Sequence, residues 1–299
     1  MDFEQIKSYG NLELLSRQLV EGFITGLHKS PYHGFSVEFA EHRLYNNGES
    51  TRHIDWKVFA KTDRLFVKRY EEETNLRCMI LVDRSSSMYY PVENAGKFNF
   101  SMVAAGALAY MLQKQRDAVG LCTFSDQIEE MTPVKSTGSH IHQLFVSMQQ
   151  KLNEPPKQQR TSAASVIHEV AKRLNRRSLI IVFSDMMENV GKQEELLAAL
   201  QHLKHNQHEV LLFHVYDQKT ELDFEFPDKP IVFVDVETGE EEKAQPAQVK
   251  EYYQQRVKEQ FQELKLRAGK YKIDFIEADC GKDIDQVLLP YLIKRKRMR

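Results

Sequence analysis

The sequence predicts an α/β protein with a doubly wound, mostly parallel β-sheet. From Leu76 onward, short apolar runs alternate with longer segments of helical periodicity. Such alternation is typical of βαβ units, whose right-handed crossovers place helices on both faces of the sheet. The chain has 299 residues, of which 41% are hydrophobic and 28% are charged, and this composition is typical of a globular protein.

Five apolar runs have the character of strands that are buried on both faces. These runs are Cys78–Val82, Ala118–Phe124, Leu179–Phe183, Val210–Val215 and Ile273–Ile276. The helical patterns cover Phe98–Gln115, His140–Leu152, Ser162–Leu174, Gln193–His205 and Ala247–Ala268. Residues 127–134 follow the second strand after only two residues, which is too short for a crossover, so we expect an antiparallel edge strand there.

Changes in pattern divide the chain into three parts. We expect an N-terminal segment, residues 1–74, to pack on an α/β domain that spans residues 75–293. An inserted hairpin or excursion near residues 221–242 interrupts the alternation within that domain. Residues 294–299 form a strongly basic tail, which we interpret as favourable charge at the C-terminal end of a helix.

Charge and composition argue against several classes of protein. The formal net charge is −2, which gives no global attraction to nucleic acid or to an anionic membrane. No apolar stretch approaches the ~20 residues that cross a bilayer, and the N-terminus lacks the apolar core of a signal peptide. The three cysteines include no C-x-x-C pair. We therefore expect a reduced, cytoplasmic protein that binds no nucleic acid and does not insert into a membrane.

The first predicted strand ends in a group of oxygen-bearing side chains. Asp83 terminates the apolar run, and Ser85 and Ser87 follow at alternating positions. Open α/β sheets place their ligands at the carboxyl ends of strands, and Mg²⁺ prefers oxygen ligands. The three side chains therefore suit a hard divalent cation. The alternative is ordinary turn and N-cap chemistry, in which the same oxygens accept hydrogen bonds from free backbone N–H groups.

This D-x-S-x-S pattern resembles the metal-ion-dependent adhesion site of von Willebrand factor type A domains. The resemblance implies a Rossmann-type sheet with one antiparallel edge strand. It also implies two further metal ligands, which map onto Thr161, before the third helix, and Asp185, after the Leu179–Phe183 strand. The loop before Thr161 lacks the usual glycines, so Ser162 or Ser165 could replace this threonine as a ligand.

Two carboxylates leave a divalent cation, Mg²⁺ or Mn²⁺, with an open coordination position. A carboxylate from another protein is the natural ligand for that position. We therefore predict a metal-dependent protein interaction module that is not an enzyme. The alternative is a metal-dependent phosphoester hydrolase. Hydrolases of the D-x-D type use a second acid two residues after the first, and Ser85 occupies that place here.

A second resemblance comes from the N-terminal segment. The run from Gly48 to Lys57 is G-E-S-T-R-H-I-D-W-K. It is similar to the block that precedes a von Willebrand A-like domain in the family known as domain of unknown function 58. Many members carry transmembrane helices ahead of this block. This chain resembles the short soluble form of the family, and we expect it to come from a bacterium. Within the block, Asp55 could pair with Arg52 or Lys57.

The family resemblance also implies a partner. It points to a MoxR-type AAA+ ATPase, with this protein acting as an adaptor in the maturation or assembly of other proteins. In that interpretation, the partner donates the acidic residue that completes the coordination of the metal.

Overall fold

The computed structural model describes residues 11–26, 39–45, 51, 54–70, 76–92, 96–155, 162–174, 176–186, 193–236 and 239–297. The chain divides into two compact units. One unit is Leu27–Asn75, and the other combines Met1–Gly26 with Leu76–Arg299. This division differs from the expected single segment of residues 1–74, because the helix before Leu27 belongs to the larger unit.

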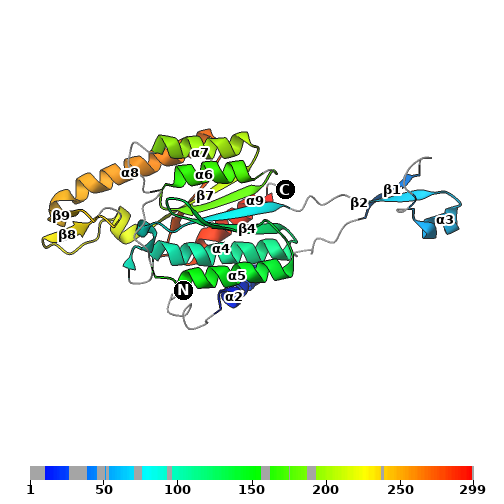
Figure 1. Cartoon of the computed structure of the whole chain (residues 1–299), viewed down its shortest axis with the longest axis horizontal. Helices are drawn as coiled ribbons and strands as arrows, with labels where there is room; N and C mark the ends of the chain where they lie inside the picture. Colours follow the sequence, from blue (N-terminus) through cyan, green and yellow to red (C-terminus); the bar gives the residue numbers. More distant parts are fainter. Residues whose placement is uncertain are drawn as a thin grey trace. The chain divides into compact units, whose positions relative to one another are not determined.

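The larger unit is built on a six-stranded sheet (Figure 1). Its strands are β3 (Arg77–Asp83), β4 (Ala118–Phe124), β5 (Ile128–Met131), β6 (Leu179–Ser184), β7 (Glu209–Tyr216) and β10 (Asp274–Asp279). Their order across the sheet is β10-β7-β6-β3-β4-β5. All neighbouring pairs are parallel except β4 and β5. The predicted α/β class, with a mostly parallel sheet and one antiparallel edge strand, is therefore confirmed.

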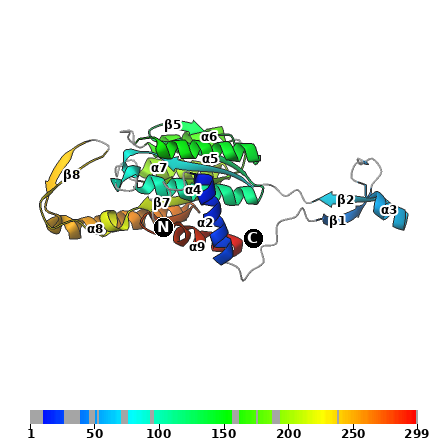
Figure 2. The same ribbon diagram turned by 90° about the horizontal axis from the view of Figure 1, so that it is seen from below.

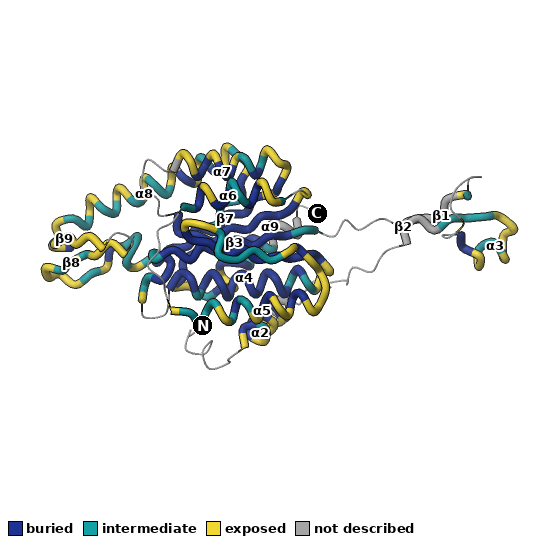
Figure 3. The backbone as a smooth tube through the Cα atoms, in the orientation of Figure 1, coloured by how far each residue is buried: buried dark blue, intermediate teal, exposed yellow. Residues whose placement is uncertain are grey.

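Helices cover both faces of this sheet. They are α2 (Leu12–Gly26), α4 (Gly96–Lys114), α5 (Gly138–Asn153), α6 (Ala163–Arg173), α7 (Gln193–His205), α8 (Pro246–Lys270) and α9 (Ile284–Arg297), and a short 3₁₀ turn, η2 (Ser86–Tyr89), follows β3. Successive strand side chains point to opposite faces. Ile80 thus joins a core with α2, α4, α5 and α9, whereas Leu81 joins a second core with α6, α7 and α8. The strands at the centre of the sheet are buried along most of their length (Figure 3).

Helix α2 packs on the outer side of α4 and α5 (Figure 2). Its residues Leu12, Leu15 and Leu19 are buried. A Cβ atom at Gly106 of α4 would lie 2.6 Å from the Oγ of Ser16 on α2. The absence of a side chain at Gly106 therefore lets the two helices approach closely, which is why α2 belongs to the α/β unit.

Between β7 and α8 the chain makes the expected excursion. It begins with a π-helical turn, η4 (Gln218–Leu222), and continues into a hairpin of β8 (Ile231–Val234) and β9 (Glu241–Ala244). The ring of Phe224 stacks on Phe233 of β8 with centroids 5.6 Å apart, and this contact holds the hairpin to the start of the excursion. The hairpin thus extends slightly beyond the expected limit of residue 242. The predicted basic tail begins inside α9, which ends at Arg297.

The smaller unit contains β1 (Phe39–Leu44), α3 (Trp56–Thr62) and β2 (Phe66–Tyr70), with β1 and β2 antiparallel. Asp55 has a structural role in this unit, because it is the N-cap of α3 and its Oδ1 accepts hydrogen bonds from the backbone N–H groups of Lys57 (3.0 Å) and Val58 (3.3 Å). Asp55 therefore bonds to the backbone of Lys57, and Arg52 lies outside the described residues. In the part of the chain that the structure describes, no helix is both long and apolar enough to cross a membrane.

Candidate functional site

The carboxylate of Asp83 is the centre of the candidate site. It ends β3 and is fully buried. Its Oδ1 accepts a hydrogen bond from the backbone N–H of Ser85 (2.8 Å), and its Oδ2 accepts one from the hydroxyl of Ser184 at the end of β6 (2.6 Å). The Oγ atoms of Ser85 and Ser87 lie 3.1 Å apart. Asp83 therefore has the turn-stabilising role that ordinary turn chemistry predicts. The two serine hydroxyls that the alternative, a cation site, would require lie next to each other in the same turn.

Asp185 lies near Asp83, as the topology predicts. It follows β6, the parallel neighbour of β3, and is 2% exposed. Burial and the nearby charge of Asp185 together raise the pKa of Asp83 to about 7. The two carboxylates are thus close enough to repel each other in a water-excluded place.

A buried lysine, Lys97, contacts the second of these acids. Its Nζ donates hydrogen bonds to Oδ2 of Asp185 (2.8 Å) and to Oε1 of Glu221 in η4 (2.5 Å). Although burial lowers the pKa of Lys97, the charges of Asp185 and Glu221 raise it above its ordinary value, so the ammonium is charged. Neither Lys97 nor Glu221 was predicted from the sequence as a site residue. A single lysine in the first turn of an apolar helix carries no signal that it is buried.

Arg84 holds the turn after β3 in place. Its guanidinium donates to Glu129 on β5 (2.6 Å), to Glu154 after α5 (3.0 Å) and to the hydroxyl of Tyr89 (3.2 Å). It also lies over the ring of Phe98, 5.4 Å from the centroid. Arg84 is 2% exposed, and its ion pairs with the two glutamates compensate its buried charge. The pair with Glu129 also connects the turn to β5 at the edge of the sheet.

The other predicted ligands are only partly described. Thr161 lies outside the described residues. Ser162 and Ser165 bond to each other through their hydroxyls (2.8 Å). The backbone N–H of Ser162 donates to the carbonyl of Ser125 in the loop after β4 (3.2 Å), so the start of α6 lies at the same edge of the sheet as Asp83. Ser184 was also missed, although the Ser-Asp pair that ends β6 could have indicated it.

The charges of this group fit a divalent cation. Asp83, Asp185 and Glu221 supply three carboxylates, and Lys97 supplies one ammonium, which leaves two negative charges when every acid is ionised. Uncompensated buried charge is costly, and the raised pKa of Asp83 is the consequence. A divalent cation held by Asp83, Asp185 and the two serine hydroxyls would compensate both charges with the oxygen ligands that Mg²⁺ prefers.

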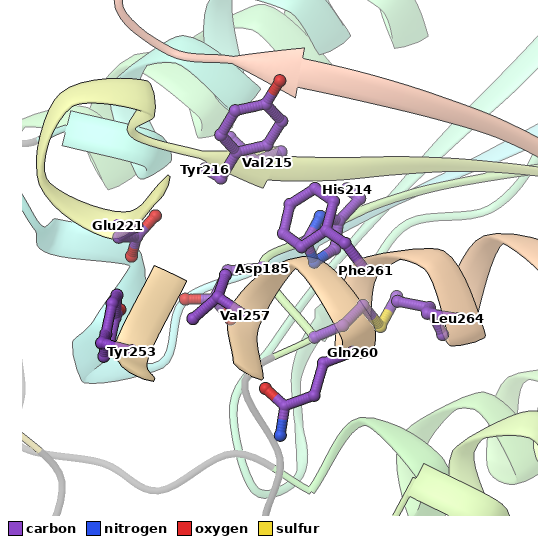
Figure 4. A pocket seen from close by; sticks show the side chains of 11 residues that line it. Asp185, His214, Val215, Tyr216, Glu221, Tyr253, Val257, Gln260, Phe261 and Leu264 are labelled. Atoms are coloured by element: carbon purple, nitrogen blue, oxygen red, sulfur yellow. The ribbon is translucent and has the colours of Figure 1, made fainter. Parts of the chain in front are cut away.

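A pocket of about 60 Å³ adjoins Asp185 (Figure 4). Helix α8 forms one wall of this pocket, including Val257 and Phe261, and His214 of β7 lies on the opposite side. Glu221 lies at one end of the pocket and Leu264 at the other (Figure 4). The candidate cation site and an apolar pocket therefore share one residue, Asp185.

Comparison with known proteins finds relatives for most of the chain. An uncharacterized protein of Mycobacterium tuberculosis is 25% identical over 229 residues, which cover 76% of this chain and 69% of the relative. An uncharacterized protein of Mycobacterium bovis matches to the same extent.

Several solved structures are also similar. The conserved hypothetical protein BatB from Bacteroides thetaiotaomicron matches with a TM-score of 0.42 and 14% identity, over 68% of this chain and 90% of that one. An aerotolerance-related membrane protein from Bacteroides fragilis matches with a TM-score of 0.45 and 15% identity, over 72% of this chain and 97% of that one.

A family match covers more than half of the sequence. Residues 41–263 match the family described as Protein of unknown function DUF58. This range includes the helix-capping Asp55, both strand-ending acids and the excursion with Glu221. The chain therefore belongs to the DUF58 family.

Proposed function

We propose that this protein is an interaction module that binds another protein through a divalent cation and does not itself catalyse a reaction. The observation that carries the proposal is the buried pair of Asp83 and Asp185, which together with Glu221 supply three carboxylates against the single ammonium of Lys97. A buried group of this charge gains stability when a divalent cation binds it.

The residues have separate roles in this proposal. Asp83 and Asp185 supply charge to Mg²⁺ or Mn²⁺, and the hydroxyls of Ser85 and Ser87 supply neutral oxygens. Thr161, outside the described residues, is the expected fifth ligand. Because few protein oxygens surround the ion, a coordination position stays open for an acidic residue of the partner.

We further propose a MoxR-type AAA+ ATPase as the partner, with this protein as an adaptor in the cytoplasm. The support for this partner is the family resemblance of the Gly48–Lys57 block. A binding role is favoured over phosphoester hydrolysis because Ser85 stands where a D-x-D hydrolase carries its proton-donating acid.

Thermal unfolding tests the cation site directly. The wild-type protein and Asp83→Asn are unfolded with EDTA and with Mg²⁺ or Mn²⁺. A cation at about 100 times its Kd stabilises the native state by about 2.7 kcal/mol, which raises the Tm of a domain of this size by several degrees. We expect this rise in the wild type and its loss in Asp83→Asn.

Asp279→Asn is the matched control. Asp279 is also a buried acid at the carboxyl end of a strand, and it accepts a hydrogen bond from the backbone of Gly281 (3.0 Å). It lies on β10, three strands away from β3. This variant should keep the full cation-dependent rise in Tm. Equal cation responses in the wild type and in Asp83→Asn would contradict the proposed site.

A further inference from the structure

The hairpin of β8 and β9 carries exposed apolar side chains. It lies at the end of α8 that extends beyond the six-stranded sheet (Figures 1 and 2). Val232 and Val234 of β8 are 45% and 54% exposed, and Val236, just after β8, is 42% exposed. Figure 3 shows exposed residues along both strands of the hairpin. A strand with exposed apolar side chains and an unpaired edge is a template for pairing with another chain.

The main chain of two of these valines faces such an edge. In the part of the chain that the structure describes, the sheet has only two strands, and no third strand pairs with β8. The N–H of Asp235 donates to the carbonyl of Glu240 (2.9 Å), so these two residues form a hydrogen-bonded pair. Hydrogen-bonded and non-hydrogen-bonded pairs alternate along an antiparallel ladder. Val232 and Val234 therefore belong to non-hydrogen-bonded pairs, and their N–H and C=O groups point away from β9.

The two edges of the hairpin differ in charge. Three of the four residues of β9, Glu241–Ala244, are charged, and charged side chains on an edge strand oppose pairing with other chains. The four residues of β8, Ile231–Val234, carry no charge and are of the types that favour strands. The edge of β8 is therefore the one that another strand can approach.

The surroundings of β8 are acidic. Residues 230–242 include five acids and no lysine or arginine. Side chains alternate between the two faces of a strand, so Asp235 lies on the face opposite to the exposed valines. Glu240 and Glu242 are opposite Asp235 and Phe233 on the neighbouring strand and share that face. The accumulated negative charge repels nucleic acid, an anionic membrane and the hairpin of a second copy, and it attracts a basic segment of another protein.

We propose that β8 is a second docking edge, which pairs with an extended segment of another protein in which β-branched apolar residues alternate with lysine or arginine. Main-chain hydrogen bonds to Val232 and Val234 provide affinity, and the alternating side chains provide specificity. The apolar side chains of the segment cover the exposed valines, while its cations lie on the face of Asp235. This docking uses none of the residues of the candidate cation site, so it does not depend on a bound cation.

A labelled peptide tests the inference. The probe is a blocked, fluorescein-labelled octapeptide of alternating valine and lysine, and the comparison peptide has glutamate in place of every lysine. Each is titrated into the full chain in EDTA at low ionic strength, and binding is followed by fluorescence polarisation. We expect the basic peptide to bind and the acidic peptide to bind at least about tenfold more weakly, because the charges of the hairpin repel it.

Two substitutions of one valine test the pairing of strands. Val234→Pro removes an N–H that faces the open edge and that the ladder with β9 does not use, so the hairpin can form while the partner strand is blocked. We expect the basic peptide to bind this variant at least about tenfold more weakly. Val234→Thr keeps the N–H and the preference for a strand, and its affinity should stay within about twofold of the wild type.

A charge reversal tests the specificity independently of the proline. In Glu240→Lys/Glu242→Lys, the basic peptide should lose affinity and the acidic peptide should gain it. Glu259→Lys/Glu263→Lys is the control, because it makes the same change of charge at two exposed positions further along α8. This control should keep the preference of the wild type for the basic peptide.

Several results would overturn the proposal. They are the absence of binding by the basic peptide, equal binding by the wild type and Val234→Pro, and an unchanged preference after the reversal of charge on the hairpin. Sedimentation of the free chain adds a further test. A wild-type dimer that Val234→Pro converts to a monomer would assign this edge to a second copy of the chain instead. Because all titrations contain EDTA, failure of the cation site would leave these results unaffected.

Discussion

The ammonium of Lys97 lies 2.8 Å from the carboxylate of Asp185, and both side chains are almost completely buried. The same ammonium bonds to Glu221, so it links the end of β6 to the π-helical turn after β7. The candidate cation site is therefore not simply a set of acids. It also contains the positively charged ammonium of Lys97, from the first turn of α4, which offsets part of the negative charge of the acids.

Lys97→Met should strongly destabilise the protein. The change leaves Asp185 and Glu221 without their shared counter-ion, and breaking a buried ion pair costs about 3–5 kcal/mol. Urea unfolding in EDTA measures the difference. The double variant Lys97→Met/Glu221→Gln should recover part of the loss, because it removes one unpaired charge.

Lys114→Met provides the control for this prediction. Lys114 lies in the last turn of the same helix and is exposed. Its replacement should change the free energy of unfolding by about 0.5 kcal/mol or less. Similar effects of the two substitutions would mean that Lys97 is not buried against the two acids.

Asp83→Asn should raise the Tm of the cation-free protein at pH 8. Burial and Asp185 raise the pKa of Asp83 to about 7, so its ionised form opposes folding above that pH. The amide keeps the shape and can still accept the hydrogen bond from Ser85. In EDTA we expect a gain of several degrees, measured by differential scanning calorimetry. A large fall in Tm would show instead that the charge of Asp83 is compensated within the protein.

Much of the fold was predictable because its central strands are buried on both faces. Such strands are continuous apolar runs, and β4 begins and ends where the sequence predicts, at Ala118 and Phe124. The acids that end β3 and β6 were predictable for the same reason, since a charge stops an apolar run abruptly. The parallel arrangement then places Asp83 and Asp185 at one edge.

The contacts that long-range packing creates were not predictable. The residues of α2 were included in the N-terminal segment, because nothing local shows that Gly106 leaves room for a helix on α4. Lys97 and Glu221 are 124 residues apart, and only the fold brings them together. The bounds of β9, the second strand of the expected hairpin, were not predictable because its sequence, Glu241 to Ala244, is mostly charged, and it forms by pairing with β8.

Arg84→Met should destabilise the turn that carries the two serines. The guanidinium bonds to Glu129 and Glu154, and its charge, together with Lys151, lowers the pKa of Glu154 despite the opposing effect of burial. Its loss removes this counter-ion from Glu129 and leaves Glu154 with Lys151 alone, and we expect a cost of a few kcal/mol in urea unfolding.

The exposed pair on α6 offers a comparison. Arg173 and Glu169 lie one turn apart and are both about half exposed. Exposed pairs of this kind contribute about 0.5 kcal/mol or less, so Arg173→Met should have little effect. If Arg84→Met were equally mild, the buried network around Arg84 would not hold the turn.

His214 should make the stability of the protein sensitive to acid. Burial is the main cause that lowers its pKa from 6.5 to about 4 in the folded protein; the charges of Asp185 and Glu277 partly oppose this shift, and the charge of Lys97 contributes to it. The unfolded chain therefore takes up a proton below pH 6.5 that the folded protein refuses. The stability that the neutral ring provides is present above pH 6.5 and is lost as the pH falls from 6.5 toward 4.

Urea unfolding of the wild type and of His214→Phe at pH 7, 6, 5 and 4 measures this dependence. Carboxylates titrate in the same range in both proteins, so the difference between them isolates His214. Because one pKa unit corresponds to about 1.4 kcal/mol, the wild type should lose about 3 kcal/mol more than the variant over this interval. Parallel pH profiles would mean that His214 takes up its proton at the same pH in the folded and unfolded protein. The ring would then be charged in mild acid, and a charged ring could not line an apolar pocket without a counter-ion.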